Sequence, residues 1–151
     1  MIYHSDFRDL FFWLNETKVD YLIVGGFAVA FHGAPRFTGD MDVLVRPDAE
    51  HVQRTLSALD RFGFSGKSVT PEYLLSRGKI LQLGNVPVQV HIMTSITGVS
   101  WEDAWASREA GSYGGVPVLF IGLTALMNNK TAAGRPKDLA DLAALRRKAL
   151  P

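Results

Sequence analysis

The sequence predicts an α+β protein in which helices flank a mixed β-sheet, and three observations support this prediction. Several segments repeat apolar residues at helical spacing, and short β-rich runs lie between them. One pair of β-rich runs flanks Gly84-Asn85, which favours an antiparallel hairpin. Regular strand-helix alternations are few, so the pattern favours a mixed sheet. Because no linker-like segment divides the chain, we expect residues 1–151 to form a single domain.

Local signals define the elements of the first half of the chain. Ser5 can cap a helix that ends near Leu14, and a β-rich run stops at Gly25-Gly26. Pro47-Asp48 can start a further helix, and Thr70 can cap a short one. We therefore expect helix 5–14, strand 21–24, helix 27–32, a strand through residues 40–45, helix 48–62 and a short helix that ends near residue 78.

The second half of the chain begins with the hairpin and ends in two helices. Ser100 and the acidic residues after it resemble a capping box. In the last helix, Leu139, Leu142 and Leu145 are expected to lie roughly on one face. The expected elements are strands 79–83 and 86–93, helix 101–107, strand 116–121, and a C-terminal helical pair at 123–133 and 136–148.

Composition limits the cellular setting and the partners. The chain has 16 Lys+Arg against 15 Asp+Glu, so a contact with nucleic acid must be local. The absence of cysteine excludes disulfides and thiolate metal sites and fits a reducing compartment. The apolar runs are far shorter than the roughly 20 residues that cross a bilayer, and the first residues lack the basic region of a signal peptide. We expect a cytoplasmic protein without a membrane partner.

The stretch Thr38-Gly39-Asp40-Met41-Asp42 places two acids at the start of an otherwise apolar strand. Side chains at i and i+2 point to the same face of a strand, so Asp40 and Asp42 project together. Two close carboxylates repel unless a cation lies between them, and Mg²⁺ is commonly held by one or two carboxylates plus phosphate oxygens. The alternative is that both acids are solvated at the strand entrance and bind nothing. A D-x-D pattern is short and common, so its context must decide.

Gly25-Gly26 supplies the first part of that context, because it joins a strand to a helix shortly before the two acids. Glycine allows a phosphate to approach the backbone closely, and the N-terminal end of a helix attracts anions. Arg36 and Thr38, on the approach to Asp40, could add a cation and a hydroxyl. Each of these features is also readable as ordinary turn or loop structure. Together they favour a site in which one part holds phosphates and the other holds the metal.

Two stretches carry a resemblance to a known family: Val24-Gly25-Gly26-Phe27-Ala28-Val29-Ala30 and Pro35-Arg36-Phe37-Thr38-Gly39-Asp40-Met41-Asp42. They resemble the hG[GS] and DhDh signature of the DNA polymerase β-like nucleotidyltransferase superfamily. The chain is most similar to its small bacterial branch, which is related to the abortive-infection (AbiEii-type) toxins. Residues 91–96, 101–105 and 130–142 support this resemblance, which extends from about Tyr21 to Leu145.

The resemblance implies a nucleotidyltransferase-like fold and transfer of a nucleoside monophosphate from an NTP, with Mg²⁺ or Mn²⁺ as cofactor. It implies an RNA acceptor such as tRNA, or a protein acceptor, and a role as the toxin of a toxin–antitoxin pair with a cognate antitoxin. Gly25 and Gly26 would line the phosphates, and Asp40 and Asp42 would bind the metal. The toxin relatives also use a lysine and an aspartate in the C-terminal helices. These match Lys130, which would contact the triphosphate, and Asp138, which would orient Lys130 or a neighbouring group.

The sequence departs from the family pattern at His91, where the family usually has a third carboxylate. Strand alternation keeps His91 directed toward the site. A histidine can accept a proton near neutral pH, but it adds no negative charge to hold a second hard ion. One reading is therefore that His91 serves as a catalytic base. Alternatively, it is only hydrogen-bonded to Asp40 or Asp42, and the protein is a catalytically weakened nucleotide-binding or partner-binding module.

Overall fold

The structure is a computed structural model that describes residues 4–64, 69–85 and 88–149. The helices and strands in these ranges are, in chain order, α1 (Ser5–Glu16), β1 (Tyr21–Val24), α2 (Gly25–Phe31), β2 (Asp40–Val45), α3 (Ala49–Phe62), α4 (Pro71–Leu75), β3 (Ile80–Asn85), β4 (Val88–Met93), α5 (Trp101–Ala106), β5 (Glu109–Tyr113), β6 (Val116–Phe120), α6 (Leu123–Ala133) and α7 (Pro136–Ala149).

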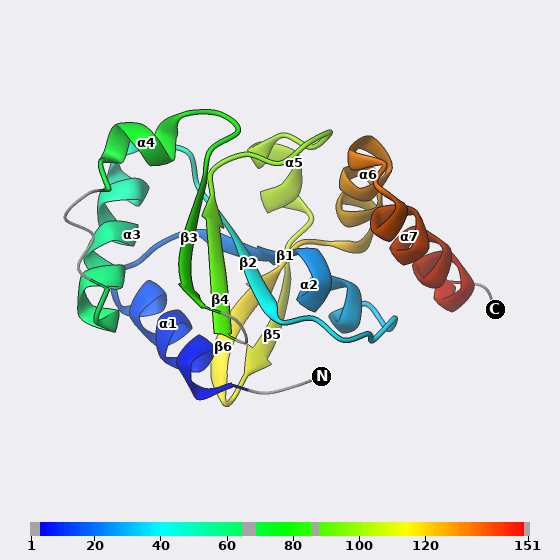
Figure 1. The fold of residues 1–151 in the computed structure, drawn as a ribbon, viewed down its shortest axis with the longest axis horizontal. Helices are drawn as coiled ribbons and strands as arrows, with labels where there is room; N and C mark the ends of the chain where they lie inside the picture. The colour runs from blue at the N-terminus through cyan, green and yellow to red at the C-terminus, as the bar shows by residue number, and fades with distance from the viewer. Residues whose placement is uncertain (1–3, 65–68, 86–87, 150–151) are drawn as a thin grey trace.

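The described strands form one mixed sheet in the order β3-β4-β2-β1-β6-β5. β2 is parallel to β4 and antiparallel to β1, and β1 is parallel to β6. The hairpins β3-β4 and β5-β6 are antiparallel and form the two ends of the sheet. Figure 1 shows the sheet in the middle of the molecule, with α3 and α4 on one side and α6 and α7 on the other. This arrangement confirms the predicted α+β fold with a mixed sheet flanked by helices.

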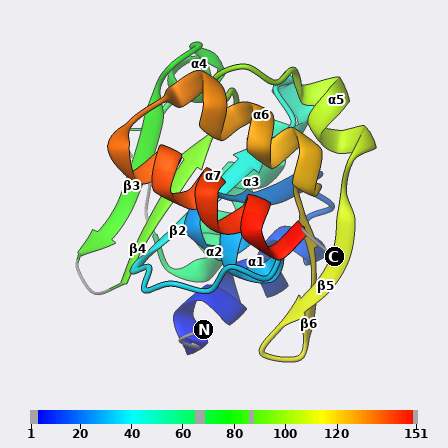
Figure 2. The same ribbon diagram turned by 90° about the vertical axis from the view of Figure 1, so that its right-hand side faces the viewer.

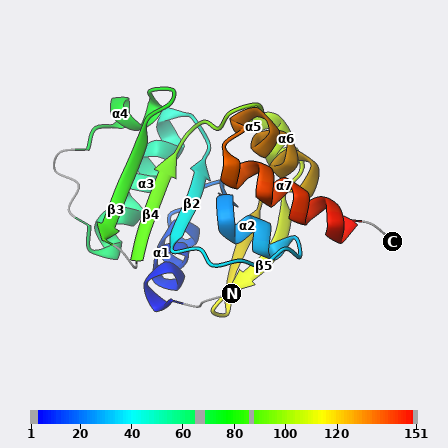
Figure 3. The ribbon, with the colours of Figure 1, turned by 45° about the vertical axis from the view of Figure 1, so that its right-hand side comes forward.

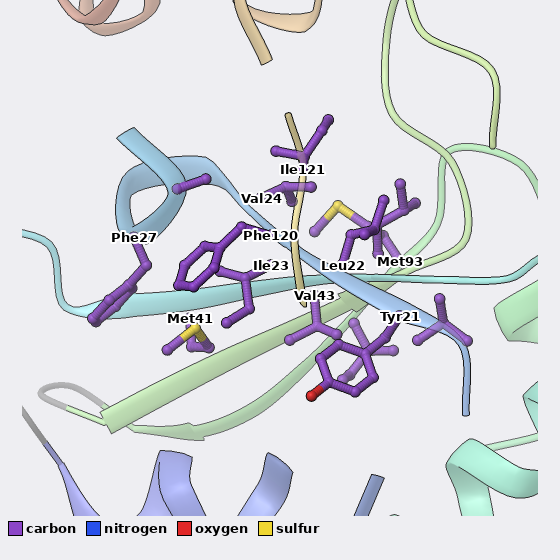
Figure 4. Packing of buried hydrophobic residues seen from close by; sticks show 14 of the residues in the cluster. Tyr21, Leu22, Ile23, Val24, Phe27, Met41, Val43, Met93, Phe120 and Ile121 are labelled. Atoms are coloured by element: carbon purple, nitrogen blue, oxygen red, sulfur yellow. The ribbon is translucent and has the colours of Figure 1, made fainter. Parts of the chain in front are cut away.

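Alternation along the central strands separates the core from the site. Tyr21, Met41 and Val43 point toward α1 and are almost completely buried, whereas Val24 and Ile121 lie on the opposite side of the sheet (Figure 4). The ring of Tyr21 stacks on Phe11 of α1 at a centroid distance of 5.5 Å. Met41 and Val43 face this core. Asp40 and Asp42, which alternate with them along β2, therefore face the other side of the sheet.

The C-terminal helices lie on the side of the molecule that carries α2. Figure 2 shows α6 and α7 in front of α2, and Figure 3 shows all three on one side of β2, away from β3 and α4. Gly134 ends α6 in the left-handed region at φ 65°, so the chain reverses into α7 without the strain that a larger residue would incur. The two helices therefore form the predicted pair. No helix in the described part of the chain is long and apolar enough to cross a membrane.

Strand β5 was not predicted from the sequence. Its residues, Glu-Ala-Gly-Ser-Tyr, are mostly exposed and have little β propensity, and the strand lies at an edge of the sheet. Gly111 has a packing role, because a Cβ at this position would lie 2.8 Å from the ring of Phe120. Phe120 in turn stacks on Phe31 at 4.0 Å. The strand is thus specified by tertiary packing rather than by its own composition.

Four local predictions need correction. His4, not Ser5, caps α1, since its Nδ1 accepts a hydrogen bond from the backbone N–H of Asp6. Helix α2 begins at Gly25 rather than at residue 27. Gly84 and Asn85 belong to β3, where they pair with Gln89 and Val88 of β4. Residues 86–87, the first two of the predicted strand 86–93, lie outside the described residues.

The fourth correction concerns α7. Leu139 is 54% exposed, while Leu142 and Leu145 are buried. Steps of three residues fall short of a full helical turn by roughly 60° each, so the first leucine of the series rotates away from the buried stripe.

Candidate active site

Most of the predicted site residues line one cleft of about 920 Å³. Those that the structure brings together there are Gly25, Gly26, Arg36, Thr38, Asp40, Asp42, His91 and Lys130. They come from the start of α2, the loop before β2, the two neighbouring strands β2 and β4, and α6. Asp138 is the exception, because it is fully buried behind Lys130 and does not line the cleft.

Asp42 and His91 are cross-strand partners in the parallel pairing of β2 with β4. Nδ1 of His91 lies 2.9 Å from Oδ1 of Asp42, and both side chains are partly exposed to the cleft. An ionised carboxylate only accepts hydrogen bonds, so the imidazole donates through Nδ1–H, and in the neutral ring the lone pair is then on Nε2. The bond thus fixes both the orientation and the tautomer of His91. Asp40 lies two residues earlier on the same face of β2, opposite Gln89.

Position 25 requires glycine for two reasons: the conformation of its backbone, and the closeness of the Asp42 side chain. Its φ of +67° is in the left-handed region, and a Cβ built on it would lie 2.1 Å from Oδ2 of Asp42. The carboxylate therefore occupies the space where a side chain would be. The sequence suggested a glycine that makes room for a phosphate, and the structure adds that this glycine makes room for the acid.

Gly26 has the same relation to the loop before β2. A Cβ at Gly26 would lie 2.6 Å from Oγ1 of Thr38 and 3.2 Å from Nη2 of Arg36. The hydroxyl of Thr38 donates to the backbone carbonyl of Asp40 at 3.4 Å. Gly26 therefore lets the loop that carries Arg36 and Thr38 pack directly against the first turn of α2.

Lys130 is held by two buried carboxylates from α7. Its Nζ lies 3.1 Å from Oδ1 of Asp138 and 3.0 Å from Oδ2 of Asp141. An ammonium group has three N–H donors, so within the described residues one is left for a ligand in the cleft. Burial by itself would raise the pKa of Asp138, but hydrogen bonds from Arg135 and Lys130 outweigh it and lower the pKa to about 2. Lys130 thus remains paired with a charged carboxylate over a wide pH range.

Asp141 connects Lys130 to the loop before β2. The guanidinium of Arg36 forms a two-pronged contact with it, with Nε to Oδ1 at 2.7 Å and Nη2 to Oδ2 at 3.1 Å. Burial opposes ionisation of Asp141, but the hydrogen bonds from Arg36 and Lys130 lower its pKa. This carboxylate was not predicted as a site residue. The repeated acid in Lys137-Asp138-Leu139-Ala140-Asp141 was the available signal, because residues three apart share a helix face.

Further cations line the cleft and were also not predicted. Arg135 donates through Nε to Oδ2 of Asp138 at 2.7 Å, yet its side chain is 60% exposed. Arg77, from the segment before β3, and Lys137, from α7, are exposed and line the same cleft. Isolated basic residues carry little sequence signal, so only the fold shows that these three share one cavity.

The cleft supplies some, but not all, of the oxygen ligands that a hard divalent ion requires. Burial raises the pKa of Asp42 despite the hydrogen bond from His91, so its charge lacks full compensation within the protein. In the described residues no group of three or more histidine, aspartate or glutamate side chains is arranged to hold a metal. Two carboxylates do fit Mg²⁺ when a nucleotide supplies further oxygens. Asp40 and Asp42 are the residues that would hold it.

Neither a protein-family model nor the sequence of a curated protein matches this chain. Solved structures do match its fold. A candidate nucleotidyltransferase from Thermotoga maritima is 17% identical, with a TM-score of 0.62 over 97% of this chain and 94% of that one. The lincosamide antibiotic adenylyltransferase LnuA, with bound lincomycin, is 14% identical, with a TM-score of 0.64 over 98% and 99% of the two chains.

A third similar structure is ANT(2'')-Ia in complex with adenylyl-2''-tobramycin. It is 14% identical, with a TM-score of 0.61 over 95% of this chain and 87% of that one. The chain therefore has the fold of the nucleotidyltransferases. Its assignment to the DNA polymerase β-like superfamily, and to the toxin-related branch within it, stays a prediction from the motifs.

Proposed function

We propose that the protein is a metal-dependent nucleotidyltransferase that transfers a nucleoside monophosphate from an NTP to a hydroxyl group of an RNA acceptor. The observation that carries this proposal is the convergence of Asp40, Asp42 and Lys130 on one cleft beside the Gly25-Gly26 turn. Paired carboxylates and a lysine at a glycine turn suit a triphosphate, because they provide a metal site, a point charge and close backbone approach. The fold of the similar structures is consistent with this chemistry.

The residues of the chain have distinct roles in this reaction. Asp40 and Asp42 would hold Mg²⁺ or Mn²⁺, which neutralises charge on the triphosphate when it is bound. Lys130 contacts the phosphates with its remaining N–H, and Asp138 keeps it in place. His91 accepts the proton of the acceptor hydroxyl at Nε2 while Nδ1–H stays on Asp42. The hydroxyl oxygen then bonds to the α-phosphorus, and pyrophosphate leaves with the electrons of the broken bond.

The charge of the cleft favours RNA as the acceptor. Apart from Asp40 and Asp42, its charged side chains are basic: Arg36, Arg77, Lys130, Arg135 and Lys137. Asp138 and Asp141 pair with Arg36, Lys130 and Arg135, so among the described residues the exposed Arg77 and Lys137 are the lining cations without an ion pair. Exposed cations of this kind attract a phosphate backbone. A protein acceptor would not need them, so label appearing on protein instead of RNA would contradict the choice of acceptor.

The proposal is tested by incubating the protein with labelled NTPs, Mg²⁺ or Mn²⁺ and total cellular RNA. We expect label on RNA with wild type and none with Asp42→Ala. Asp60→Ala, at an exposed aspartate of α3, serves as the matched control and should label RNA like wild type. Equal labelling by wild type and Asp42→Ala would contradict the proposal.

A second candidate, a catalytically weakened nucleotide-binding or partner-binding module, is favoured by one specific observation. His91 engages Oδ1 of Asp42, and within the described residues no third carboxylate joins Asp40 and Asp42 in a group that could hold a metal. Such a module would bind NTPs without turnover, so transfer by the purified wild type would exclude it. Binding without transfer under every metal and acceptor condition would favour it.

A toxin role, with a cognate antitoxin as partner, rests on the resemblance of the motifs alone. Induced expression of the wild-type gene should arrest bacterial growth, and expression of the Asp42→Ala variant should not. Co-expression of a neighbouring antitoxin-like gene should restore growth. Unimpaired growth at high expression would remove the toxin role and leave the transferase proposal in place.

A further inference from the structure

Phe37 is the most exposed large apolar side chain in the described part of the protein. It is 76% exposed, compared with 45% for Phe12 and 37% for Phe31. Those two phenylalanines have aromatic partners, since Phe12 contacts Trp13 edge-on and Phe31 stacks on Phe120. Within the described residues, Phe37 has no ring partner. Its face is therefore available to a ligand.

The exposure of Phe37 does not arise from a loose loop. On one side, Arg36 is fixed by its two hydrogen bonds to Asp141, and its Nη1 donates to the backbone carbonyl of Phe37 at 3.0 Å. On the other side, Thr38 packs against Gly26. The backbone of Phe37 is therefore held between two residues that belong to the candidate active site, and its ring is presented from a fixed position.

Phe37 also lines the cleft that contains Asp40, Asp42 and Lys130. The exposed apolar side chains of this lining are Phe37, from the loop before β2, and Ile80, which is 50% exposed on β3. The charged groups of the cleft suit the phosphates of a nucleotide. The flat apolar ring of Phe37 suits the base, because the base is the flat and apolar part of a nucleotide. Aromatic side chains beside basic residues are the usual way in which proteins bind bases without reading their sequence.

We propose that Phe37 is a stacking platform for a nucleobase. This inference rests on the proposed function, because it assumes that the cleft receives nucleotide phosphates. The base can come from the NTP or from the RNA acceptor. Both sources offer the same planar ring, and the two are separated by measuring each ligand alone.

The test compares wild type, Phe37→Ala and Phe37→Tyr for three probes: ATP, inorganic tripolyphosphate and a single-stranded 12-nucleotide oligoadenylate RNA. Titration calorimetry measures the first two, and fluorescence anisotropy measures the third. Phe12→Ala, which removes an exposed phenyl group outside the cleft lining, is the control. Melting curves of each variant verify that the fold is retained.

If the platform receives the base of the NTP, Phe37→Ala should weaken ATP binding about tenfold, the scale of losing one base–aromatic stack, and leave tripolyphosphate binding unchanged. If it receives an acceptor base, the same change should weaken RNA binding about tenfold and leave ATP unaffected. Phe37→Tyr, which keeps the ring, should bind like wild type in both cases.

Equal affinities of wild type and Phe37→Ala for ATP and for RNA would overturn the inference. Equal weakening of ATP and tripolyphosphate would also overturn it, because the loss would then not depend on the base. These measurements need no turnover. A protein that binds as predicted but transfers nothing would refute the transferase proposal alone.

Discussion

Nδ1 of His91 and Oδ1 of Asp42 lie 2.9 Å apart across the parallel pair of β2 and β4. The contact joins the histidine that replaces an expected carboxylate to the second acid of the D-x-D pattern. Nε2 of His91 has no partner in the described part of the chain, so the pair has the base-and-orienter arrangement by which a carboxylate holds an imidazole for proton transfer. The same contact would arise if His91 only stabilised Asp42, and mutation distinguishes the two roles.

The first prediction is that His91→Gln lowers the transfer rate by about 10²-fold, since a positioned general base typically contributes at least that much. ATP affinity should be nearly unchanged, because His91 is not assigned to phosphate binding. Single-turnover rates with saturating nucleotide, combined with calorimetric titration, separate the two effects. In the proposed role, His91→Asp should also be slow. A faster His91→Asp variant would show instead that wild type lacks a metal ligand.

The second prediction concerns Gly25. Gly25→Ala should reduce transfer by 10²-fold or more, because the new Cβ would displace the carboxylate of Asp42 and a 1 Å misplacement can cost about this much. It should also lower the free energy of unfolding by roughly 1–2 kcal/mol through backbone strain. Transfer rates and denaturant titrations measure both quantities.

Gly63 offers a matched control for this change. It has a φ of +104° at the end of α3, and a Cβ there would meet nothing within 4 Å. Gly63→Ala should therefore carry the strain without the displacement of Asp42, so its stability falls while its transfer rate does not. If both variants lose activity to the same degree, the contact between Gly25 and Asp42 has no special role.

Much of the fold could be predicted because its signals are local. Asp48, Thr70 and Ser100 were expected near the starts of helices, and each caps its helix with a side-chain hydrogen bond. The exposed edge strand β5 could not be predicted, since its position depends on packing between Gly111 and Phe120 rather than on an apolar pattern.

The candidate site likewise has residues that could be predicted from the sequence and residues that only the fold brings together. Strand alternation accounts for the shared face of Asp40 and Asp42, whereas Lys130 and Asp138 were indicated by the family resemblance alone. The contact between Arg36 and Asp141 joins residues 105 positions apart in the sequence. No local rule indicates such a pair, because it exists only once α7 packs beside the loop before β2.

The third prediction uses this contact. Arg36→Lys keeps the positive charge but loses the planar fork that binds both oxygens of Asp141. We expect ATP affinity to fall about 5- to 10-fold, because the loop beside Gly26 loses its attachment to α7. Calorimetric titration measures the affinity. Arg146→Lys, at an exposed arginine of α7, should have no effect on ATP affinity. Wild-type affinity in Arg36→Lys would show that the loop holds its position without the fork.

The final prediction concerns Asp138 and acid stability. Asp138→Asn should lower the free energy of unfolding at neutral pH by roughly 2–3 kcal/mol, because Lys130 and Arg135 lose a buried charged partner. The pKa of Asp138 falls from its ordinary value of 3.8 to about 2 on folding. Between these values the unfolded chain binds a proton at this carboxyl and the folded protein does not, so the stabilisation is present above about pH 4 and is lost as the pH falls toward 2. Melting temperatures of wild type and Asp138→Asn should therefore converge over this window. Asp60→Asn, at an exposed aspartate of α3, is the control for the substitution itself. A difference between wild type and Asp138→Asn that is constant from pH 7 to pH 2 would show that the carboxylate charge does not hold Lys130 in place.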